Sequence, residues 1–155
     1  MTNDIRLISP SQLEEWLKQQ GEPRFRAGQI SEWIWQKQAL SFDEMTNLPL
    51  ALREKGKAEF VFRPIEEDFV QTSRDGTIKS RFKLHDGHMI ESVLIPVPDE
   101  KRFTACVSSQ VGCSLACKFC ATGMMGRIRN LDFPEIYDQV VRVNRQALEH
   151  FGHPL

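Results

Sequence analysis

Residues 106–120 read Cys106-Val-Ser-Ser-Gln-Val-Gly-Cys113-Ser-Leu-Ala-Cys117-Lys-Phe-Cys120 and contain all four cysteines of the 155-residue chain. The last three have the spacing C-x-x-x-C-x-x-C, which gathers three thiolates around one small group. Thiolate is a soft ligand that suits zinc or an iron–sulfur cluster. A structural zinc site requires four ligands in a closed tetrahedron, and this spacing supplies three. The pattern therefore favours a cluster with one open iron.

Two other interpretations remain open on these residues alone. Zinc could be bound with Cys106 or His88 as the fourth ligand, or the cysteines could be buried residues without a metal. With Phe119 beside the last cysteine and a strand predicted at Phe103–Ser108, the spacing resembles that of radical-SAM enzymes. In that superfamily a [4Fe–4S] cluster on three cysteines binds S-adenosylmethionine (SAM) at its open iron. Three glycines would let the loop wrap closely around such a cluster: Gly112, Gly123 and Gly126.

The composition is that of an ordinary soluble protein, with 41% hydrophobic and 26% charged residues. The N-terminus lacks the basic and apolar regions of a signal peptide, and no apolar run has membrane-spanning length. We therefore expect no membrane association, a cytoplasmic location and reduced thiols.

The net charge of −1 does not by itself indicate a nucleic-acid partner. Between Lys101 and Arg145, however, the sequence contains seven basic residues and three acidic ones. Such an excess beside the cysteines could bind a phosphate backbone, or it could form a solvated surface of mixed charge.

Residues 1–60 are predicted to form a small helical module that could bind RNA. Ser9, Pro10 and Gln12 have the pattern of a capped helix start, and Gly21 ends that helix. The other predicted helices are Arg26–Lys37 with the stripe Ala27, Ile30 and Ile34, a short helix opened by a capping box at Ser41–Glu44, and Pro49–Glu59.

Three tryptophans stand out in this module. Trp16, Trp33 and Trp35 could stack on nucleotide bases, but tryptophans in small helical modules more often belong to the core. We expect core positions for Trp16 and Trp33, and exposure for Trp35 because it lies off the Ile30–Ile34 stripe.

Residues 61–98 are predicted to be an antiparallel β connector. Asp75-Gly76 and Asp86-Gly87 are typical hairpin turns. They would join three strands: Asp68–Arg74, Thr77–His85 and His88–Ile95.

Residues 99–155 are predicted to begin a radical-SAM core. Strand Phe103–Ser108 leads into the cysteine loop, and a capping box at Asp132 opens a helix to about His150 with the stripe Ile136, Val140 and Val143. We interpret strand, loop and helix as the first β/α unit of a truncated partial barrel, whose next strand and covering sheet are absent. The predicted fold class is α+β leading into α/β.

Longer motifs narrow the resemblance to the RlmN/Cfr family of radical-SAM RNA methyltransferases. They are Cys-Val-Ser-Ser-Gln-Val-Gly-Cys113, Cys-Lys-Phe-Cys120-Ala-Thr-Gly, Arg129-Asn130-Leu131 and Glu91-Ser-Val-Leu-Ile-Pro96, together with a helical module whose second helix is rich in tryptophan. The match covers essentially the whole chain. The first and third motifs favour members that methylate C2 of an adenine in 23S rRNA and tRNA, and Cfr-type C8 methylation is the alternative.

The resemblance also implies a mechanism and roles for particular residues. Cys113, Cys117 and Cys120 would bind the cluster, with Phe119 beside the cofactor and a flavodoxin or ferredoxin as reductant. SAM cleavage gives a 5′-deoxyadenosyl radical, which acts on a methyl group carried by a protein cysteine to form an RNA adduct. Glu91 matches the proton acceptor, and Cys106 matches the thiol that releases the product and forms a disulfide. The methyl-carrying cysteine and the SAM-gripping segments would lie beyond Leu155, so this chain alone is expected to be inactive.

The residue pattern offers separate support for Glu91. Alternation along the strand His88–Ile95 places it on one face with three apolar residues: Met89, Val93 and Ile95. A carboxylate buried among such neighbours takes up a proton more readily, which suits a general base near neutral pH. The alternative is a glutamate at a sheet edge that faces water.

A second class of function also stays open. The chain could be a stand-alone zinc-binding module that recognises RNA.

Overall fold

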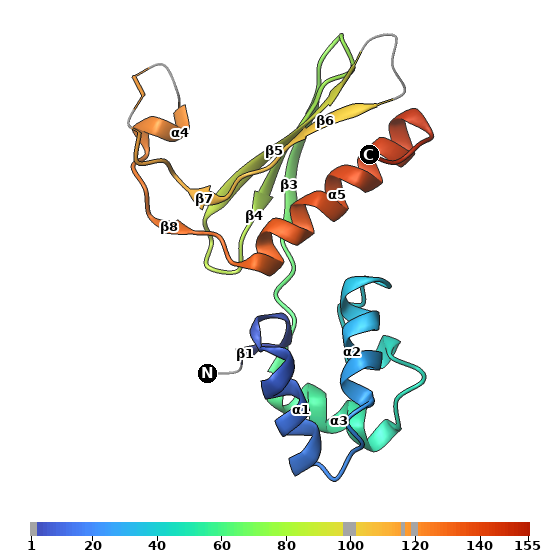
Figure 1. Cartoon of the computed structure of the whole chain (residues 1–155). Coiled ribbons are helices and arrows are strands. Elements are labelled where there is room, and N and C mark those ends of the chain that lie inside the picture. Colours follow the sequence, from blue (N-terminus) through green and yellow to red (C-terminus); the bar gives the residue numbers. More distant parts are fainter. Residues whose placement is uncertain (1–2, 98–101, 116, 119–120) are drawn as a thin grey trace. The chain divides into compact units, whose positions relative to one another are not determined.

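The computed structural model describes residues 3–97, 102–115, 117–118 and 121–155 (Figure 1). The chain forms two compact units, Met1–Arg63 and Pro64–Leu155. The sequence suggested three segments, divided near residues 60 and 98. In the structure, everything beyond the helical module belongs to one unit.

The first unit is mainly helical. Its elements in chain order are β1 (Asn3–Asp4), the 3₁₀ turn η1 (Ile5–Leu7), α1 (Pro10–Gln19), α2 (Arg26–Trp35), the 3₁₀ turn η2 (Phe42–Glu44), α3 (Leu50–Glu59) and β2 (Phe60–Val61). Strands β1 and β2 pair in parallel and bring the two ends of the unit together. Asp4 strengthens this junction, because its carboxylate accepts from the Arg63 backbone N–H at 3.0 Å and pairs with buried Arg6 at 2.9 Å.

The capping signals are confirmed at α1. Ser9 Oγ accepts from the Gln12 N–H at 3.2 Å, and Gln12 Oε1 accepts from the Ser9 N–H at 2.7 Å. Gly21 ends the helix with a φ of 75°. At Ser41 the expected short helix is only the turn η2, because Glu44 Oε1 accepts from the Leu40 N–H and does not close a capping box on Ser41.

The tryptophans pack on the core of this unit. Trp16 is buried and donates its Nε1–H to Glu59 Oε2 at 2.6 Å, which confirms the core interpretation. Trp33 and Trp35 are both half-buried against the same core. The expected exposure of Trp35 is therefore wrong, because a side chain beside the main stripe still covers the edge of a small core.

The second unit contains a four-stranded antiparallel sheet in the order β3-β4-β5-β6. The strands are β3 (Glu66–Thr72), β4 (Ile78–Lys83), β5 (Met89–Pro96) and β6 (Phe103–Cys106). Gly76 and Gly87 have φ values of 84° and 86°, which confirms both hairpin turns.

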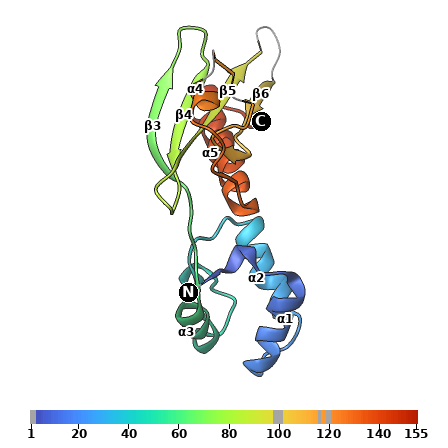
Figure 2. The same cartoon turned by 90° about the vertical axis from the view of Figure 1, so that its left-hand side faces the viewer.

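The long helix α5 (Phe133–Phe151) lies along one face of this sheet (Figures 1 and 2). Val143 is 0% exposed and joins Ile78 and Leu94 in one buried cluster. The predicted stripe is partly wrong, because Val140 is exposed and the buried side of α5 is centred elsewhere. That buried side includes polar residues: Glu135, Asp138, Gln139 and Gln146.

The expectation that this helix lacks a sheet to cover is also wrong. The predicted connector strands supply the sheet, and β6 joins it by antiparallel pairing with β5. Within the described residues β6 has no parallel neighbour. The mixed helix-and-sheet class is thus confirmed, whereas the partial barrel stays a prediction.

No helix in the described part of the chain combines the length and the apolar character needed to cross a membrane.

Two helical glycines of the first unit give a matched pair of substitutions. A Cβ on Gly56 would lie 2.5–2.8 Å from ring atoms of buried Phe42, whereas a Cβ on Gly28 would meet nothing within 4 Å. We expect Gly28→Ala to raise the free energy of unfolding by about 0.5 kcal/mol through helix propensity. Gly56→Ala should lower it by about 1–3 kcal/mol through overpacking. Urea unfolding followed by tryptophan fluorescence measures both, and a stabilised Gly56→Ala would contradict this packing.

Candidate functional site

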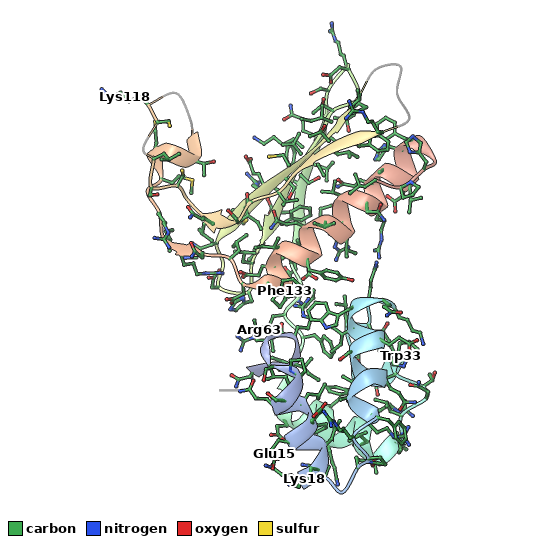
Figure 3. The ribbon with its side chains drawn as sticks, viewed as in Figure 1. Glu15, Lys18, Trp33, Arg63, Lys118 and Phe133 are labelled. Atoms are coloured by element: carbon green, nitrogen blue, oxygen red, sulfur yellow. The ribbon has the colours of Figure 1, made fainter. Side chains whose placement is uncertain are left out.

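The cysteine loop, residues 112–128, leaves the sheet and returns to it between two short paired segments, residues 110–111 and 129–130, which we call the neck. Strands β7 (Gln110–Val111) and β8 (Arg129–Asn130) pair antiparallel at its base, and the short helix α4 (Ala121–Met124) lies within the loop. Leu131 N–H donates to Ser109 O at 2.9 Å, beyond the end of this ladder. Figure 3 shows Lys118 at the far end of the loop, away from the sheet.

Two glycines make the neck possible. Gly112 and Gly126 have φ values of 73° and 67°, which are costly for other residues. A Cβ on Gly112 would overlap the carbonyl oxygen of Gly126, so the two backbone segments approach as closely as glycine allows. The tight loop predicted from these two glycines is confirmed, whereas its wrapping around a cluster stays a prediction.

The predicted ligands fall partly within the described residues. Cys113 and Cys117 are half-buried free thiols in the loop. Cys120 and Phe119 lie outside the described residues. Free, partly accessible thiols on a loop with a fixed neck fit an iron–sulfur cluster, because thiolate sulfur is its usual ligand.

Cys106 and Glu91 lie on the same face of the sheet. Cys106 on β6 pairs with Val93 on β5, and Glu91 precedes Val93 by two residues. Paired residues of antiparallel strands share a face, so Cys106 and Glu91 are diagonal neighbours, roughly 7–8 Å apart between Cα atoms. This is the face opposite α5, because Ser92 and Leu94 point toward the helix side and are buried.

The expected burial of Glu91 is wrong. Its side chain is 45% exposed, and its Oε2 lies 2.9 Å from Lys79 Nζ. Alternation does put it with Met89, Val93 and Ile95, as predicted, but these neighbours are themselves exposed or half-buried. The structure therefore has the water-facing part of the alternative, with the carboxylate beside a lysine, although β5 is an inner strand of the sheet and not its edge.

Gln139 of α5 fastens the start of the cysteine segment to the sheet. Its Oε1 accepts from Ser92 Oγ at 2.9 Å and from the Ser108 N–H at 2.8 Å. Its Nε2 donates to Ser108 O at 3.0 Å and to Glu135 O at 3.1 Å. Ser108 Oγ in turn donates to the carbonyl oxygen of Glu91 at 2.7 Å.

Arg129 fastens the end of the loop. Its guanidinium makes two hydrogen bonds of 2.8 Å to the Glu135 carboxylate and a further one to Asp86 in the turn between β4 and β5. Burial acts to raise the pKa of Glu135, but hydrogen bonds from Arg129 and the Asp132 N–H outweigh it and lower that pKa. Hydrogen bonds to Glu135 and Asp86 raise the pKa of Arg129 in spite of its burial. Arg129 is one of the seven basic residues counted between Lys101 and Arg145, and its charge is used in ion pairs within the protein.

Several of these residues were not singled out by the sequence. Gln139 and Lys79 carry no motif of their own, and Glu135 is recognised in the sequence only as part of the capping box at Asp132. The available signal was a row of polar residues on α5, at positions 135, 139 and 146, which recurs at nearly helical spacing. The apolar stripe predicts a different buried side, although serines on the sheet provide buried partners for amides.

The fold and this loop resemble part of a solved radical SAM methyltransferase. The solved structure of a radical SAM methyltransferase from Sphaerobacter thermophilus matches with a TM-score of 0.78 and 42% sequence identity. The match covers 99% of this chain and 44% of that chain.

Within this class, the chain belongs to the RlmN family. The family model described as the ribosomal RNA large subunit methyltransferase N-terminal domain matches residues 4–61. A probable dual-specificity RNA methyltransferase RlmN from Cytophaga hutchinsonii is 51% identical over 97% of this chain. The dual-specificity RNA methyltransferase RlmN 2 from Myxococcus xanthus is 47% identical, also over 97%. The chain spans 41% and 39% of the lengths of these two relatives, so it corresponds to an N-terminal portion of the family.

The Glu135–Arg129 pair predicts a pH dependence of stability. Because the pKa of Glu135 is lowered by folding, the pair stabilises the fold above the ordinary value of 4.5, and this contribution is lost as the pH falls below it. We expect Glu135→Gln to lower the free energy of unfolding by about 2–4 kcal/mol near neutral pH, because Arg129 is left without its main partner. The difference from wild type should shrink as the pH falls below the ordinary glutamate range.

Urea unfolding followed by circular dichroism over this pH range measures the effect. Glu149→Gln, on the exposed side of the same helix, is the control and should change stability by less than about 0.5 kcal/mol. A difference between Glu135→Gln and wild type that stays constant with pH would refute this electrostatic interpretation.

Proposed function

We propose that the chain is part of an enzyme that methylates C2 of an adenine in 23S rRNA and in tRNA by radical-SAM chemistry. The observation that carries this proposal is the cysteine loop, which presents free thiols of a C-x-x-x-C-x-x-C motif from a fixed neck beside the strands of Glu91 and Cys106. The relatives named as dual-specificity RNA methyltransferases support the RNA substrates.

Cys113, Cys117 and Cys120 would hold a [4Fe–4S] cluster, with Phe119 beside it. When bound, the cluster and SAM supply a 5′-deoxyadenosyl radical. The loop residues would keep the thiols oriented and limit the access of water. An exogenous reductant of the flavodoxin or ferredoxin class would supply the electron, and the cytoplasm is the compartment where such thiols stay reduced.

Cys106 and Glu91 would complete the reaction from the sheet. Both are exposed on one face, so a substrate base lying over that face could be reached by a thiol and a carboxylate together. Glu91 would accept the proton from C2 of the adenine adduct. The Cys106 thiolate would then attack the sulfur of the methyl-carrying cysteine, so that a disulfide forms as the bond from that sulfur to the transferred carbon breaks, and the carbon takes up a proton to become the methyl group. The Lys79 ion pair holds the carboxylate on this face.

Iron content tests the ligand assignment. We expect Cys113→Ala, Cys117→Ala and Cys120→Ala each to abolish iron incorporation during anaerobic reconstitution, because three ligands leave no redundancy. Cys106→Ala is the matched control and should retain wild-type iron. Loss of iron in Cys106→Ala would make it a ligand, and a colourless protein that retains zinc would support the RNA-binding zinc module.

A second substitution tests Glu91 in a version of the protein with the full length of its relatives. Glu91→Gln keeps the size of the side chain but removes the base, so the protein should accumulate covalently joined to RNA. Asp68→Asn removes a neighbouring surface ion pair, the one with Arg81 at 2.6 Å, and should turn over normally. A denaturing gel that detects protein–RNA adducts makes the comparison. Normal product formation by Glu91→Gln would assign this residue a structural role only.

A further inference from the structure

Gln139 uses its whole hydrogen-bonding capacity on one junction. The side chain is 0% exposed, and its amide makes two accepting and two donating hydrogen bonds, the full set for a glutamine. Two of them go to the N–H and the C=O of Ser108. This is the pairing that a neighbouring β-strand would offer, made here by a side chain.

The position of this contact along the chain is informative. Regular pairing of β6 with β5 ends at Cys106, two residues short of the predicted strand end at Ser108. Gln139 binds the backbone just beyond that point, where the chain turns toward the cysteine loop. The Ser108 hydroxyl then ties the same junction to the backbone of Glu91 on β5.

Glu135 binds the chain in the same way where it leaves the cysteine loop. It precedes Gln139 by four residues, so both side chains project from the same side of α5. Its carboxylate is buried and binds Arg129 of β8, and it also accepts from the Asp132 N–H at 2.8 Å. One helix face thus holds the chain on both sides of residues 112–128.

We propose that Gln139 and Glu135 are positioning residues that fix the entry and the exit of the cysteine loop, and thereby set how its thiols stand relative to Cys106 and Glu91. The part that concerns a bound cluster rests on the proposed function. The part that concerns the backbone of the loop does not.

Gln146 provides a matched control on the same helix. It is also buried, and its amide exchanges hydrogen bonds with Ser80 Oγ at 2.7 and 3.1 Å and donates to Glu67 Oε2 at 3.3 Å. Both glutamines therefore join α5 to a buried serine of the sheet. Only Gln139 also binds the segment that enters the loop.

The experiment compares Gln139→Met with Gln146→Met in the chain printed above. Methionine keeps the length and flexibility of glutamine, so each change removes the hydrogen bonds with little change in volume. Amide hydrogen exchange is measured at Ile128 and Leu131, whose N–H groups close the neck. We expect Gln139→Met to speed this exchange about tenfold and Gln146→Met to leave it near wild type.

The second readout is the electron paramagnetic resonance signal of the reduced, reconstituted protein. Gln139→Met should change the shape of this signal or the reduction potential of the cluster that gives rise to it. Gln146→Met should change neither, although both variants lose a buried hydrogen-bonded pair. Equal effects of the two variants on exchange, or no effect of Gln139→Met, would overturn the proposal. If wild-type protein assembles no cluster, the proposed function fails, but the exchange comparison still decides the role of Gln139.

If Gln139→Met does not fold, a variant that keeps some of the hydrogen bonds of Gln139 still tests the proposal. Gln139→Glu retains the acceptor for Ser92 Oγ and the Ser108 N–H but loses both donated hydrogen bonds, to Ser108 O and to Glu135 O. Exchange at the neck should then lie between wild type and a tenfold increase. Wild-type exchange in this variant would show that the backbone contact to Ser108 does not fix the loop.

Discussion

The second unit depends on how α5 packs against the antiparallel sheet. That interface combines an apolar cluster around Val143 with buried amides and a carboxylate that bind serines, backbone groups and an arginine. Buried polar groups are costly unless every hydrogen bond is made, and once made they allow only one register. The same contacts that align the helix also fix both ends of the cysteine loop, so the position of the site follows from the packing of the helix.

Much of this architecture could be predicted from local sequence signals. The serine cap of α1, the two Asp-Gly turns and the alternation along β5 act within a few residues, and each has the predicted form. The tight loop around the cysteine motif could likewise be predicted, because the glycines at 112 and 126 that allow it belong to the same short segment of sequence. Local signals work where the interaction that shapes the backbone lies nearby in the sequence.

The errors have a common physical origin in contacts between distant residues. The buried side of α5 was misplaced because the serines that pair with its glutamines lie 47 and 66 residues away in sequence. The exposure of Glu91 depends on what covers the sheet, and its ion pair with Lys79 crosses to another strand. The antiparallel pairing of β6 could not be read from its own residues either, since strand direction is decided by the neighbour. Periodicity identifies a face but does not say which partner it meets.

We propose that the cysteine loop holds an iron–sulfur cluster through three thiolates and leaves one iron open. Mössbauer spectroscopy of protein reconstituted with isotopically enriched iron tests this directly, with and without SAM or imidazole as an added ligand. We expect a [4Fe–4S] spectrum in which one iron site changes when the ligand is added. A spectrum that no added ligand alters, or a protein that binds zinc in place of iron, would contradict it.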